Sequence, residues 1–374
     1  MHAPSPKPKS PLGLIETVAE QLRIRLQYGP EFIGDLAQIE VGLTPRSCVY
    51  AEGPHRLYHY PAQGAANRGP VLLVYSLINR PYIFDLRPQR SLIEFLCLQG
   101  HDVYLLDWGD PTPDMAYTTL GELIMGVLRR CLRKVQRRSG QTAIPLLGYC
   151  MGATFAALYA AYRPQDVSRL ILLTPILGND ADGALQRIAA RQDFGAGLLE
   201  AQLLSGRQLK WFFNAIKPAG VLKKERDFWQ NFESESFLEH FLPVEKWSND
   251  TPDLPGKAFS EFIELVIRRD ALKGGTVCLD GQTLNFSTVS CPVLGVVARH
   301  DWIIPASSLQ TCAEVLSQAD FTPYLLSGGH IGLVVGRSAG VLWQDLLAFL
   351  AGEQVRPPQP PAAQLPMGQA PAAK

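Results

Sequence analysis

The chain has 374 residues, of which 47% are hydrophobic and 19% are charged, so it can bury a large core and cannot be mainly disordered. Its 35 Lys and Arg residues balance 35 Asp and Glu residues. This balance removes the long-range positive field that nucleic-acid-binding proteins use. We therefore expect no nucleic-acid partner.

The two ends of the sequence differ from the rest in composition. Residues 1–11 are rich in Pro and Lys and lack the apolar region of a signal peptide, and residues 353–374 are rich in Pro. We predict that both segments are flexible. No apolar run approaches the roughly 20 residues of a transmembrane helix, so we expect a cytoplasmic protein without a transmembrane segment. The seven cysteines form no CxxC pair, which argues against a disulfide framework and a zinc site.

Short apolar runs alternate with helical patterns along most of the chain. A helix is predicted over 120–138, because Leu123, Val127, Cys131 and Val135 recur every four residues and cations precede Gly140. The runs are typical of strands that are covered on both faces, and so they predict an α/β fold with a mostly parallel sheet. The predicted strands are 71–77, 102–107, 144–147, 169–174, 293–298 and 322–326.

Residues 180–290 interrupt this alternation. Aromatic residues recur there at helical spacing, which predicts a helical cap inserted into a core formed by residues 12–179 and 291–352. Open α/β sheets bind ligands at the carboxyl ends of their strands, so the cap is expected to lie over a ligand site. Its aromatic side chains can cover that site, form a dimer face or pack the cap helices against one another. They are Trp211, Phe212, Phe213, Phe228, Trp229 and Phe232.

The sequence Gly-Tyr-Cys-Met-Gly at 148–152 follows a predicted strand and precedes a predicted helix. This context is typical of a nucleophile elbow, with Cys150 at the position of the nucleophile. Side chains at Gly148 and Gly152 are expected to collide with the neighbouring strand and helix. A buried structural cysteine is the alternative interpretation.

An elbow of this kind predicts an acid and a histidine on loops after later strands. Asp301 follows the predicted strand 293–298, and His330 follows the predicted strand 322–326. We predict that His330 accepts the thiol proton of Cys150 and that Asp301 orients the imidazole. A turn or helix cap at Asp301 and a packing role for His330 are the alternatives.

A nucleophile of this kind also needs donors for the oxyanion that forms when it attacks. We predict the backbone N–H of Met151 as one donor and an N–H near Leu77 or Ile78, assigned to Ile78, as the second. A thiol that captures an acyl group from a thioester forms another thioester, which keeps the acyl group activated for transfer. The sequence therefore favours an acyltransferase that acts on acyl-CoA, while hydrolysis stays open if water reaches the intermediate.

Several motifs in one order give the sequence a resemblance to the polyhydroxyalkanoate synthases over residues 42–336. In length it is similar to the short catalytic subunit of the two-subunit class III type. The motifs are VYSLINRPY at 74–82, GHDVYLLDWG at 100–109, GYCMG at 148–152, EKW at 245–247, CPVL at 291–294 and GGHIG at 328–332. The sequence departs from the usual family pattern at Ala153, where Gly is usual, at Trp302, where His is usual, and at Met151, where the short type commonly has Gln.

The resemblance implies an α/β-hydrolase fold in which Cys150 carries the acyl group, His330 is the base and Asp301 is the third member. It implies polymerisation of (R)-3-hydroxyacyl-CoA with release of CoA, at the surface of a polyester granule. CoA is then part of the substrate and a product, and we expect no cofactor and no metal. The resemblance also implies a second, non-catalytic subunit and a homodimer formed through the cap.

Two alternatives belong to other functional classes. One is a Cys-dependent α/β hydrolase of esters or thioesters similar to dienelactone hydrolase, whose elbow is also Gly-Tyr-Cys-x-Gly. The other is a non-catalytic granule-associated protein that has kept the fold. The presence of Cys150, Asp301 and His330 argues against the second alternative.

Overall fold

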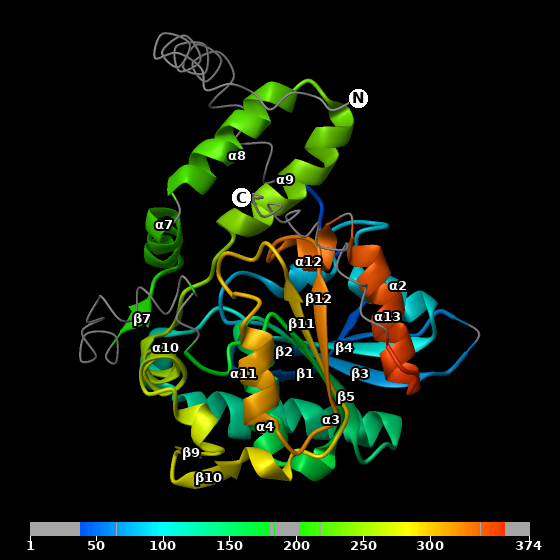
Figure 1. Ribbon diagram of the computed structural model, residues 1–374. Coiled ribbons are helices and arrows are strands. Elements are labelled where there is room, and N and C mark those ends of the chain that lie inside the picture. Colours follow the sequence, from blue (N-terminus) through cyan, green and yellow to red (C-terminus); the bar gives the residue numbers. More distant parts are fainter. Residues whose placement is uncertain are drawn as a thin grey trace, which may run out of the picture.

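Figure 1 shows the computed structural model, which describes residues 38–355 except 65, 180–182, 184–201, 217 and 337. The main sheet of these residues is built from β1 (Ser47–Glu52), β2 (His55–Tyr60), β3 (Gly69–Val74), β4 (His101–Asp107), β5 (Ile144–Tyr149), β6 (Val167–Leu173), β11 (Val293–Ala298) and β12 (Phe321–Leu326). Its spatial order is β1-β2-β4-β3-β5-β6-β11-β12. Neighbouring strands from β4 to β12 are parallel, and β1 and β2 add an antiparallel edge.

All six strands predicted from the sequence are present, with bounds that shift by a few residues. β11 has the predicted bounds, whereas β3 ends at Val74, three residues before the predicted end. The hairpin of β1 and β2 was not predicted. Its strands mix polar and apolar residues without regular alternation, and only part of β2 is buried, so the hairpin lacks the continuous apolar run of the central strands.

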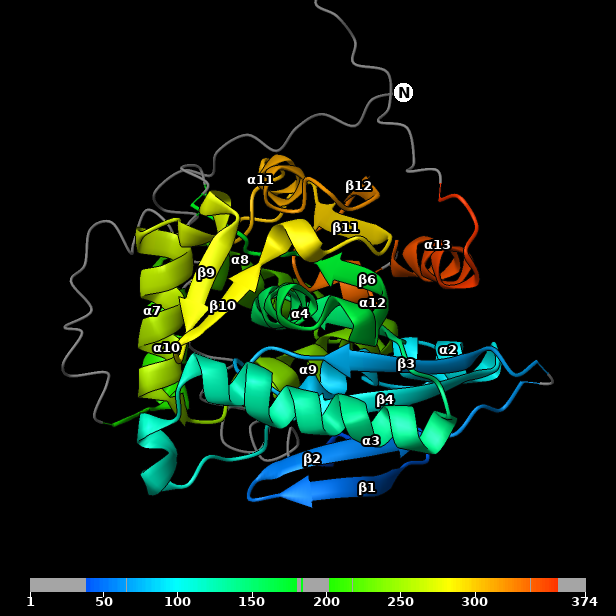
Figure 2. The ribbon, with the colours of Figure 1, turned by 90° about the horizontal axis from the view of Figure 1, so that it is seen from below.

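Helices cover both faces of the sheet and form two apolar cores (Figure 2). Leu72 and Val74 pack into the core that contains residues of α3 (Arg129–Ser139), α4 (Met151–Tyr162) and α11 (Ser308–Val315). Val71 and Leu73 pack into the core of α2 (Leu92–Leu98) and α13 (Ala339–Ala351). Successive residues of a strand point to opposite faces. Each side chain of this size contributes about 1.5–3 kcal/mol when it is fully buried.

The predicted helix 120–138 is also present. It begins with a π-helical stretch, Glu122–Leu128, which continues directly into α3. Gly140 ends the helix in the left-handed conformation at φ 73°, and its N–H donates to the carbonyl of Gln136 at 2.9 Å. Arg137 and Arg138 lie in the last turn, where cations interact favourably with the helix dipole.

The segment between β6 and β11 has two parts. α7 (Gly206–Ile216), α8 (Pro218–Asn231) and α9 (Glu235–Asn249), which we call the cap helices, extend away from the sheet at the top of Figure 1. α10 (Gly256–Phe262) packs against the core, where Phe262 contacts Phe155 of α4 with ring centroids 6.4 Å apart. Short strand pairs accompany these helices: β7 (Leu203–Leu204) with β8 (Leu254–Pro255), and β9 (Thr276–Leu279) with β10 (Gln282–Asn285).

The β9–β10 hairpin lies beside α4 and was not predicted within the helical insertion (Figure 2). The division into a core, 12–179 and 291–352, and a cap, 180–290, stays a prediction. We predicted flexible segments at 1–11 and 353–374. The first lies outside the described residues, and so does the second from residue 356 onward. Among the helices that the structure describes, none combines the length and apolar character required to cross a bilayer.

Candidate active site

Cys150 lies at the sharp turn between β5 and α4, where the sequence predicts an elbow. Its backbone has φ 56° and ψ −127°, a region that residues with a side chain rarely adopt. The backbone N–H of Cys150 donates to the carbonyl of Leu173 at 2.9 Å, and the Cys150 carbonyl accepts from the N–H of Ala153 at 2.9 Å. The strained backbone is thus held by β6 on one side and by the first turn of α4 on the other.

The two glycines of the elbow, residues 148–152, have the packing role that the sequence predicts. A Cβ atom at Gly148 would lie 2.5 Å from the Cα of Ala153, and a Cβ at Gly152 would lie 2.3 Å from the carbonyl oxygen of Val74. Real Cβ atoms essentially never approach other atoms this closely, and both neighbours are backbone atoms that cannot move aside. The collision expected at both positions is therefore confirmed.

Asp301 and His330 meet at the same edge of the sheet as Cys150. Asp301 follows β11 and His330 follows β12, and the imidazole Nδ1 lies 2.7 Å from the Asp301 Oδ2. The other carboxylate oxygen of Asp301 accepts from the backbone N–H groups of Ile303 and Ile304, at 2.8 Å and 3.0 Å. These bonds hold the carboxylate in one orientation, with both of its oxygens occupied.

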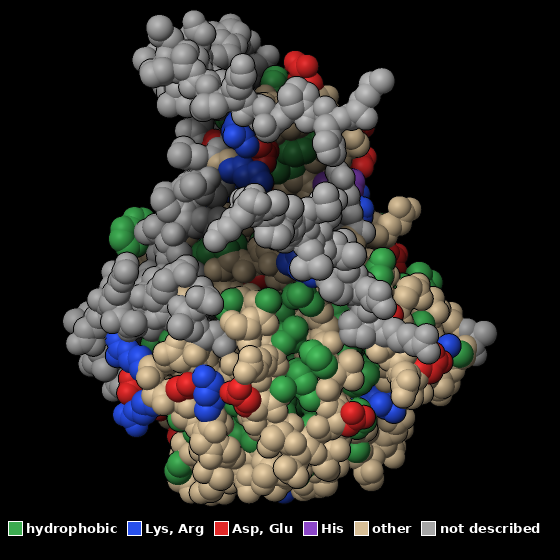
Figure 3. Space-filling view, in the orientation of Figure 1, with side chains coloured by type: hydrophobic (Ala, Val, Ile, Leu, Met, Phe, Trp, Pro, Cys, Tyr) green, Lys and Arg blue, Asp and Glu red, His purple; other side chains and the backbone are tan. Residues whose placement is uncertain are grey.

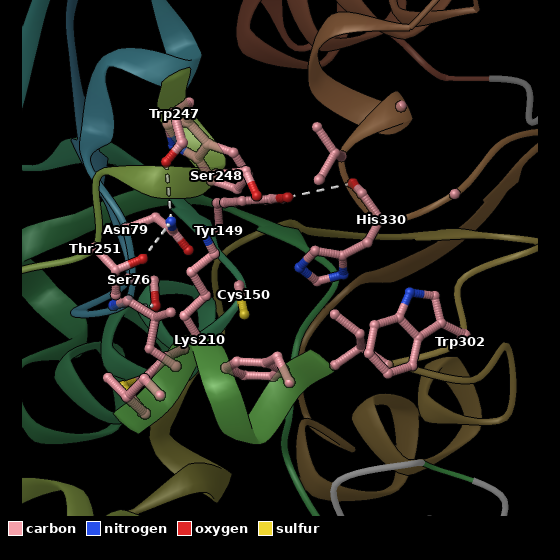
Figure 4. A pocket seen from close by; sticks show the side chains of 18 of the residues that line it. Ser76, Asn79, Tyr149, Cys150, Lys210, Trp247, Ser248, Thr251, Trp302 and His330 are labelled. Carbon is pink, nitrogen blue, oxygen red and sulfur yellow. Dashed lines mark hydrogen bonds between the residues drawn. The ribbon is translucent and has the colours of Figure 1, made fainter. Parts of the chain in front are cut away.

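The imidazole of His330 is turned toward the Cys150 side chain (Figure 4). Burial lowers the pKa of His330, but the charge of Asp301, the hydrogen bond that His330 donates to Asp301 and the interactions with Cys150 together raise this pKa to about 10. The imidazole of His330 therefore binds a proton more tightly than a free imidazole does.

Tyr149 connects the nucleophile strand to the histidine loop. Its hydroxyl donates to the backbone carbonyl of His330 at 3.2 Å, and its ring lies against the imidazole with centroids 5.3 Å apart. Tyr75 stacks on Tyr149 with ring centroids 5.8 Å apart. Nothing in the sequence distinguished Tyr149 from an ordinary core aromatic residue, because the contact joins positions 181 residues apart.

The side chains of Cys150 and His330 line a cavity of about 700 Å³, which is within the usual range for small-molecule sites. Its walls come from the sheet edge, from α10 and from the cap helices, and they are mainly apolar. Phe259, Phe262 and Ile263 contribute buried apolar surface. His300 and Trp302, the neighbours of Asp301 in the sequence, line the cavity as well.

The loop after β3 joins this cavity to α9 (Figure 4). Asn79 has a left-handed backbone at φ 63°, and its side-chain amide donates to the Trp247 carbonyl at 3.1 Å and to Thr251 Oγ1 at 2.9 Å. Arg80 bonds Asp250 at 3.1 Å and Asp110 at 2.6 Å. Neither residue was assigned a role from the sequence, although both lie in the motif VYSLINRPY at 74–82.

The same loop contains the second predicted oxyanion donor. The N–H of Ile78 donates to the hydroxyl of Ser76 at 3.0 Å, so it already has an acceptor. Met151 is the first residue of α4, and the first N–H groups of a helix have no acceptor within the helix. The geometry therefore favours Met151 over Ile78 as a donor to a ligand.

The cap aromatic residues do not share one environment. Phe213 lines the cavity, whereas Phe228 is buried against Trp229 and Phe241, with ring centroids 4.9 and 5.2 Å apart. Trp211 is 73% exposed, and the side chain of Phe212 is outside the described residues. Within residues 38–355, apart from the gaps named above, no three His, Cys, Asp or Glu side chains gather where they could hold a metal ion.

The fold and the order of the three side chains define a class. A parallel sheet with a strained residue between β5 and α4, an acid after β11 and a histidine after β12 is the arrangement of an α/β hydrolase. Residues 69–336 match the family model described as the alpha/beta hydrolase fold. A solved hydrolase from Pseudomonas aeruginosa PA01 has the same fold, with 17% identity and a TM-score of 0.53 over 83% of this chain and 99% of that one.

Sequence similarity identifies a family within the α/β hydrolases. The chain is 32% identical to the poly(3-hydroxyalkanoate) polymerase subunit PhaC of Allochromatium vinosum, over 84% of this chain and 90% of that protein. It is 34% identical to the protein of the same name from Haloferax mediterranei, over 84% of this chain, and there it spans 65% of the relative's length. The chain belongs to the poly(3-hydroxyalkanoate) polymerase family of α/β hydrolases.

Proposed function

We propose that this chain polymerises (R)-3-hydroxyacyl groups from coenzyme A into a polyester and releases CoA. The observation that carries the proposal is the position of Cys150, a strained cysteine at the wall of a mainly apolar cavity and beside the His330–Asp301 pair. The names of the relatives support the same reaction. In this proposal CoA is part of the substrate and a product, and the chain uses no cofactor and no metal.

Cys150, His330 and Asp301 divide the chemistry of the first step. The raised pKa of His330 favours transfer of the Cys150 thiol proton to the imidazole Nε2, and the resulting thiolate attacks the carbonyl carbon of the thioester. The bond between that carbon and the CoA sulfur breaks, and His330 gives its proton to the departing thiolate. Asp301 keeps Nδ1 protonated and stabilises the imidazolium through the 2.7 Å bond. The acyl group is then a thioester of Cys150.

The second step forms the ester bond. The hydroxyl of another 3-hydroxyacyl unit gives its proton to His330 and attacks the carbonyl carbon of the Cys150 thioester. The bond from that carbon to the sulfur breaks, and the sulfur takes the proton from His330 as it leaves. In both steps the backbone N–H of Met151 stabilises the negative oxygen. Ile78 remains the predicted second donor, and it would have to share its N–H with Ser76.

The apolar wall of the cavity supports transfer over hydrolysis. The acyl intermediate can react either with the hydroxyl of a second unit or with water, and an apolar lining disfavours the water. Phe259, Phe262 and Ile263 make up part of this lining. The alternative, a hydrolase similar to dienelactone hydrolase, would release CoA and free acid without making polymer.

We also propose the assembly and location that the family resemblance implies. The relatives are named as subunits, which supports a second, non-catalytic subunit as a partner. A homodimer through the cap helices and a cytoplasmic location at a polyester granule complete the proposal.

The experiment is incubation of the purified full chain with (R)-3-hydroxybutyryl-CoA, with and without a candidate second subunit. CoA release is measured by a thiol assay and polymer by recovery of insoluble polyester. We expect CoA and polyester to form in amounts proportional to each other. CoA release without polyester would contradict the proposal and favour the hydrolase.

Variants at Cys150 test the chemistry separately. Cys150→Ala should reduce CoA release by a factor of about 1,000 or more while the folded state persists, because the residual rate then lacks a nucleophile. Mass spectrometry of the unaltered chain should find a 3-hydroxyacyl adduct on Cys150. The control is Cys97→Ala at a buried cysteine that lies outside the cavity. An adduct on any residue other than Cys150 would contradict the assignment.

A further inference from the structure

The cavity wall gains cationic groups where the cap helices form it. Phe262 and Ile263 contribute apolar side chains from the core side, whereas α7 and α8, at the cap end, contribute three lysines beside Leu209 and Phe213. We call Lys210, Lys223 and Lys224 the lysine cluster. Figure 3 shows Lys and Arg side chains recessed beside hydrophobic ones in the upper part of the molecule, where Figure 1 has α8 and α9. A ligand that fits this wall carries both an apolar group and negative charge.

A hydrogen-bond network holds two of these lysines in place. Lys224 Nζ bonds both carboxylate oxygens of Glu245 at 2.8 Å, and Glu245 also accepts from the Asn249 amide at 2.9 Å. The Asn249 side-chain oxygen in turn accepts from Lys210 Nζ. The network joins α7, α8 and α9, so the two ammonium groups lie along one side of the cap.

The network does not neutralise the cluster. Glu245 balances Lys224, but the network partner of Lys210 is an uncharged amide. Lys223 is exposed and is not part of the network. Among the described residues that line the cavity, Asp227 is the one carboxylate, and Arg226 pairs with it at 3.3 Å. The cap end of the cavity therefore keeps an excess of positive charge.

We propose that the lysine cluster binds the phosphate groups of coenzyme A. This inference rests on the proposed function, in which an acyl-CoA thioester reacts at Cys150. The pantetheine arm separates the thioester from the diphosphate and the 3′-phosphate, so the phosphates must lie well away from the sulfur of Cys150. Ammonium groups are effective phosphate ligands, and α7 and α8 provide them at the cap end of the same cavity.

The test compares two thioesters of the same acyl group. One is (R)-3-hydroxybutyryl-CoA, and the other is (R)-3-hydroxybutyryl-N-acetylcysteamine, which keeps the thioester but lacks every phosphate. In the double variant K210A/K223A we expect KM for the CoA thioester to rise about tenfold. KM for the truncated thioester and kcat for both should stay as in the unaltered chain. Lys223→Glu alone should raise KM for the CoA thioester further than Lys223→Ala.

Arg138→Ala is the control for the loss of a positive charge. Arg138 is exposed at the end of α3 and is not among the residues that line the cavity. Neither KM should change in this variant. Added NaCl should raise KM for the CoA thioester in the unaltered chain and less so in K210A/K223A, because salt screens exposed charges.

Two outcomes would overturn the inference. An equal rise in KM for both thioesters would mean that the lysines only hold the cap helices together. Unchanged KM for both would mean that the phosphates do not contact the cluster. If the unaltered chain transfers from neither thioester, the proposed function fails by itself. Calorimetric binding of CoA and pantetheine to the unaltered chain and K210A/K223A then still tests the phosphate site.

Discussion

The elbow and the cap helices face the same cavity but are built in different ways. Around Cys150 the strands β3, β5 and β6 are almost fully buried, and the backbone of the turn is fixed by bonds from neighbouring elements. The cap helices extend from the sheet, expose Trp211, and are tied to the core by polar contacts such as those of Asn79 and Arg80. The comparison indicates a rigid centre for the chemistry beneath a less firmly held substrate-binding surface.

A substitution at Gly152 tests how tightly the elbow is packed. Gly152→Ala should lower the free energy of unfolding by about 3 kcal/mol, because its Cβ would lie 2.3 Å from the Val74 carbonyl oxygen. Urea denaturation measures the change. The control is Gly340→Ala in α13, where a Cβ meets nothing within 4 Å and the helix should gain up to about 1 kcal/mol. Equal stability of the two variants would show that the elbow is not tightly packed.

The charge pair at the centre is tested by Asp301→Asn. We expect kcat for CoA release to fall by about 100-fold or more, because an amide no longer stabilises the imidazolium of His330. The matched control is Asp102→Asn, which alters a second His–Asp contact, His59 Nε2 to Asp102 at 2.8 Å, outside the cavity. A similar loss of kcat in both variants would show that the His330–Asp301 pair has no special role in catalysis.

Asp301→Asn should also change how the free energy of unfolding depends on pH. Folding raises the pKa of His330 from 6.5 to about 10, so the folded state holds an extra proton between these values. The resulting stabilisation is complete below about pH 6.5 and is lost as the pH rises toward 10. Relative to Asp301→Asn, the unaltered chain should lose up to about 1.4 kcal/mol per pH unit in this range. Parallel pH curves for the two proteins would contradict this prediction.

Tyr149 tests the contact between the elbow and the histidine loop. Tyr149→Phe removes the hydroxyl that donates to the His330 carbonyl, and kcat should fall about fivefold as the imidazole loses a positioning contact. The pH dependence of kcat should shift with it. Tyr159→Phe is the control, since it loses a buried hydroxyl bond to Asp166 at 2.8 Å, away from the cavity. A pH profile that shifts equally in both variants would indicate a general packing effect.

The attachment of the cap is tested by Arg80→Gln. Loss of the Arg80 pairs with Asp250 and Asp110 should speed hydrogen exchange in α9 about threefold, while exchange in β5 stays unchanged. Arg130→Gln, which breaks a pair with Glu52 near the edge of the sheet, should leave α9 unaffected. Faster exchange in both α9 and β5 would mean that the cap and the core open together.

Local signals in the sequence were enough to predict the central sheet, the elbow at Cys150 and the order in which Asp301 and His330 follow it. Continuous apolar runs are local signals, and so are the glycines of 148–152 and the loops that end with Asp301 and His330. The carboxyl ends of parallel strands meet at one edge, so these loops could be placed together before any coordinates were known. The edge hairpin β1–β2 and the hairpin β9–β10 were missed, because their short strands carry many polar residues.

The residues from distant parts of the chain that surround this edge could be identified from the folded arrangement alone. Tyr149 reaches the His330 carbonyl, Asn79 holds α9, and Lys210 and Lys224 share one network across three helices. Each of these contacts joins side chains on separate elements, and its geometry depends on how those elements pack. Neither composition nor the spacing along the chain carries that information, because the packing of two elements is a property of both surfaces together.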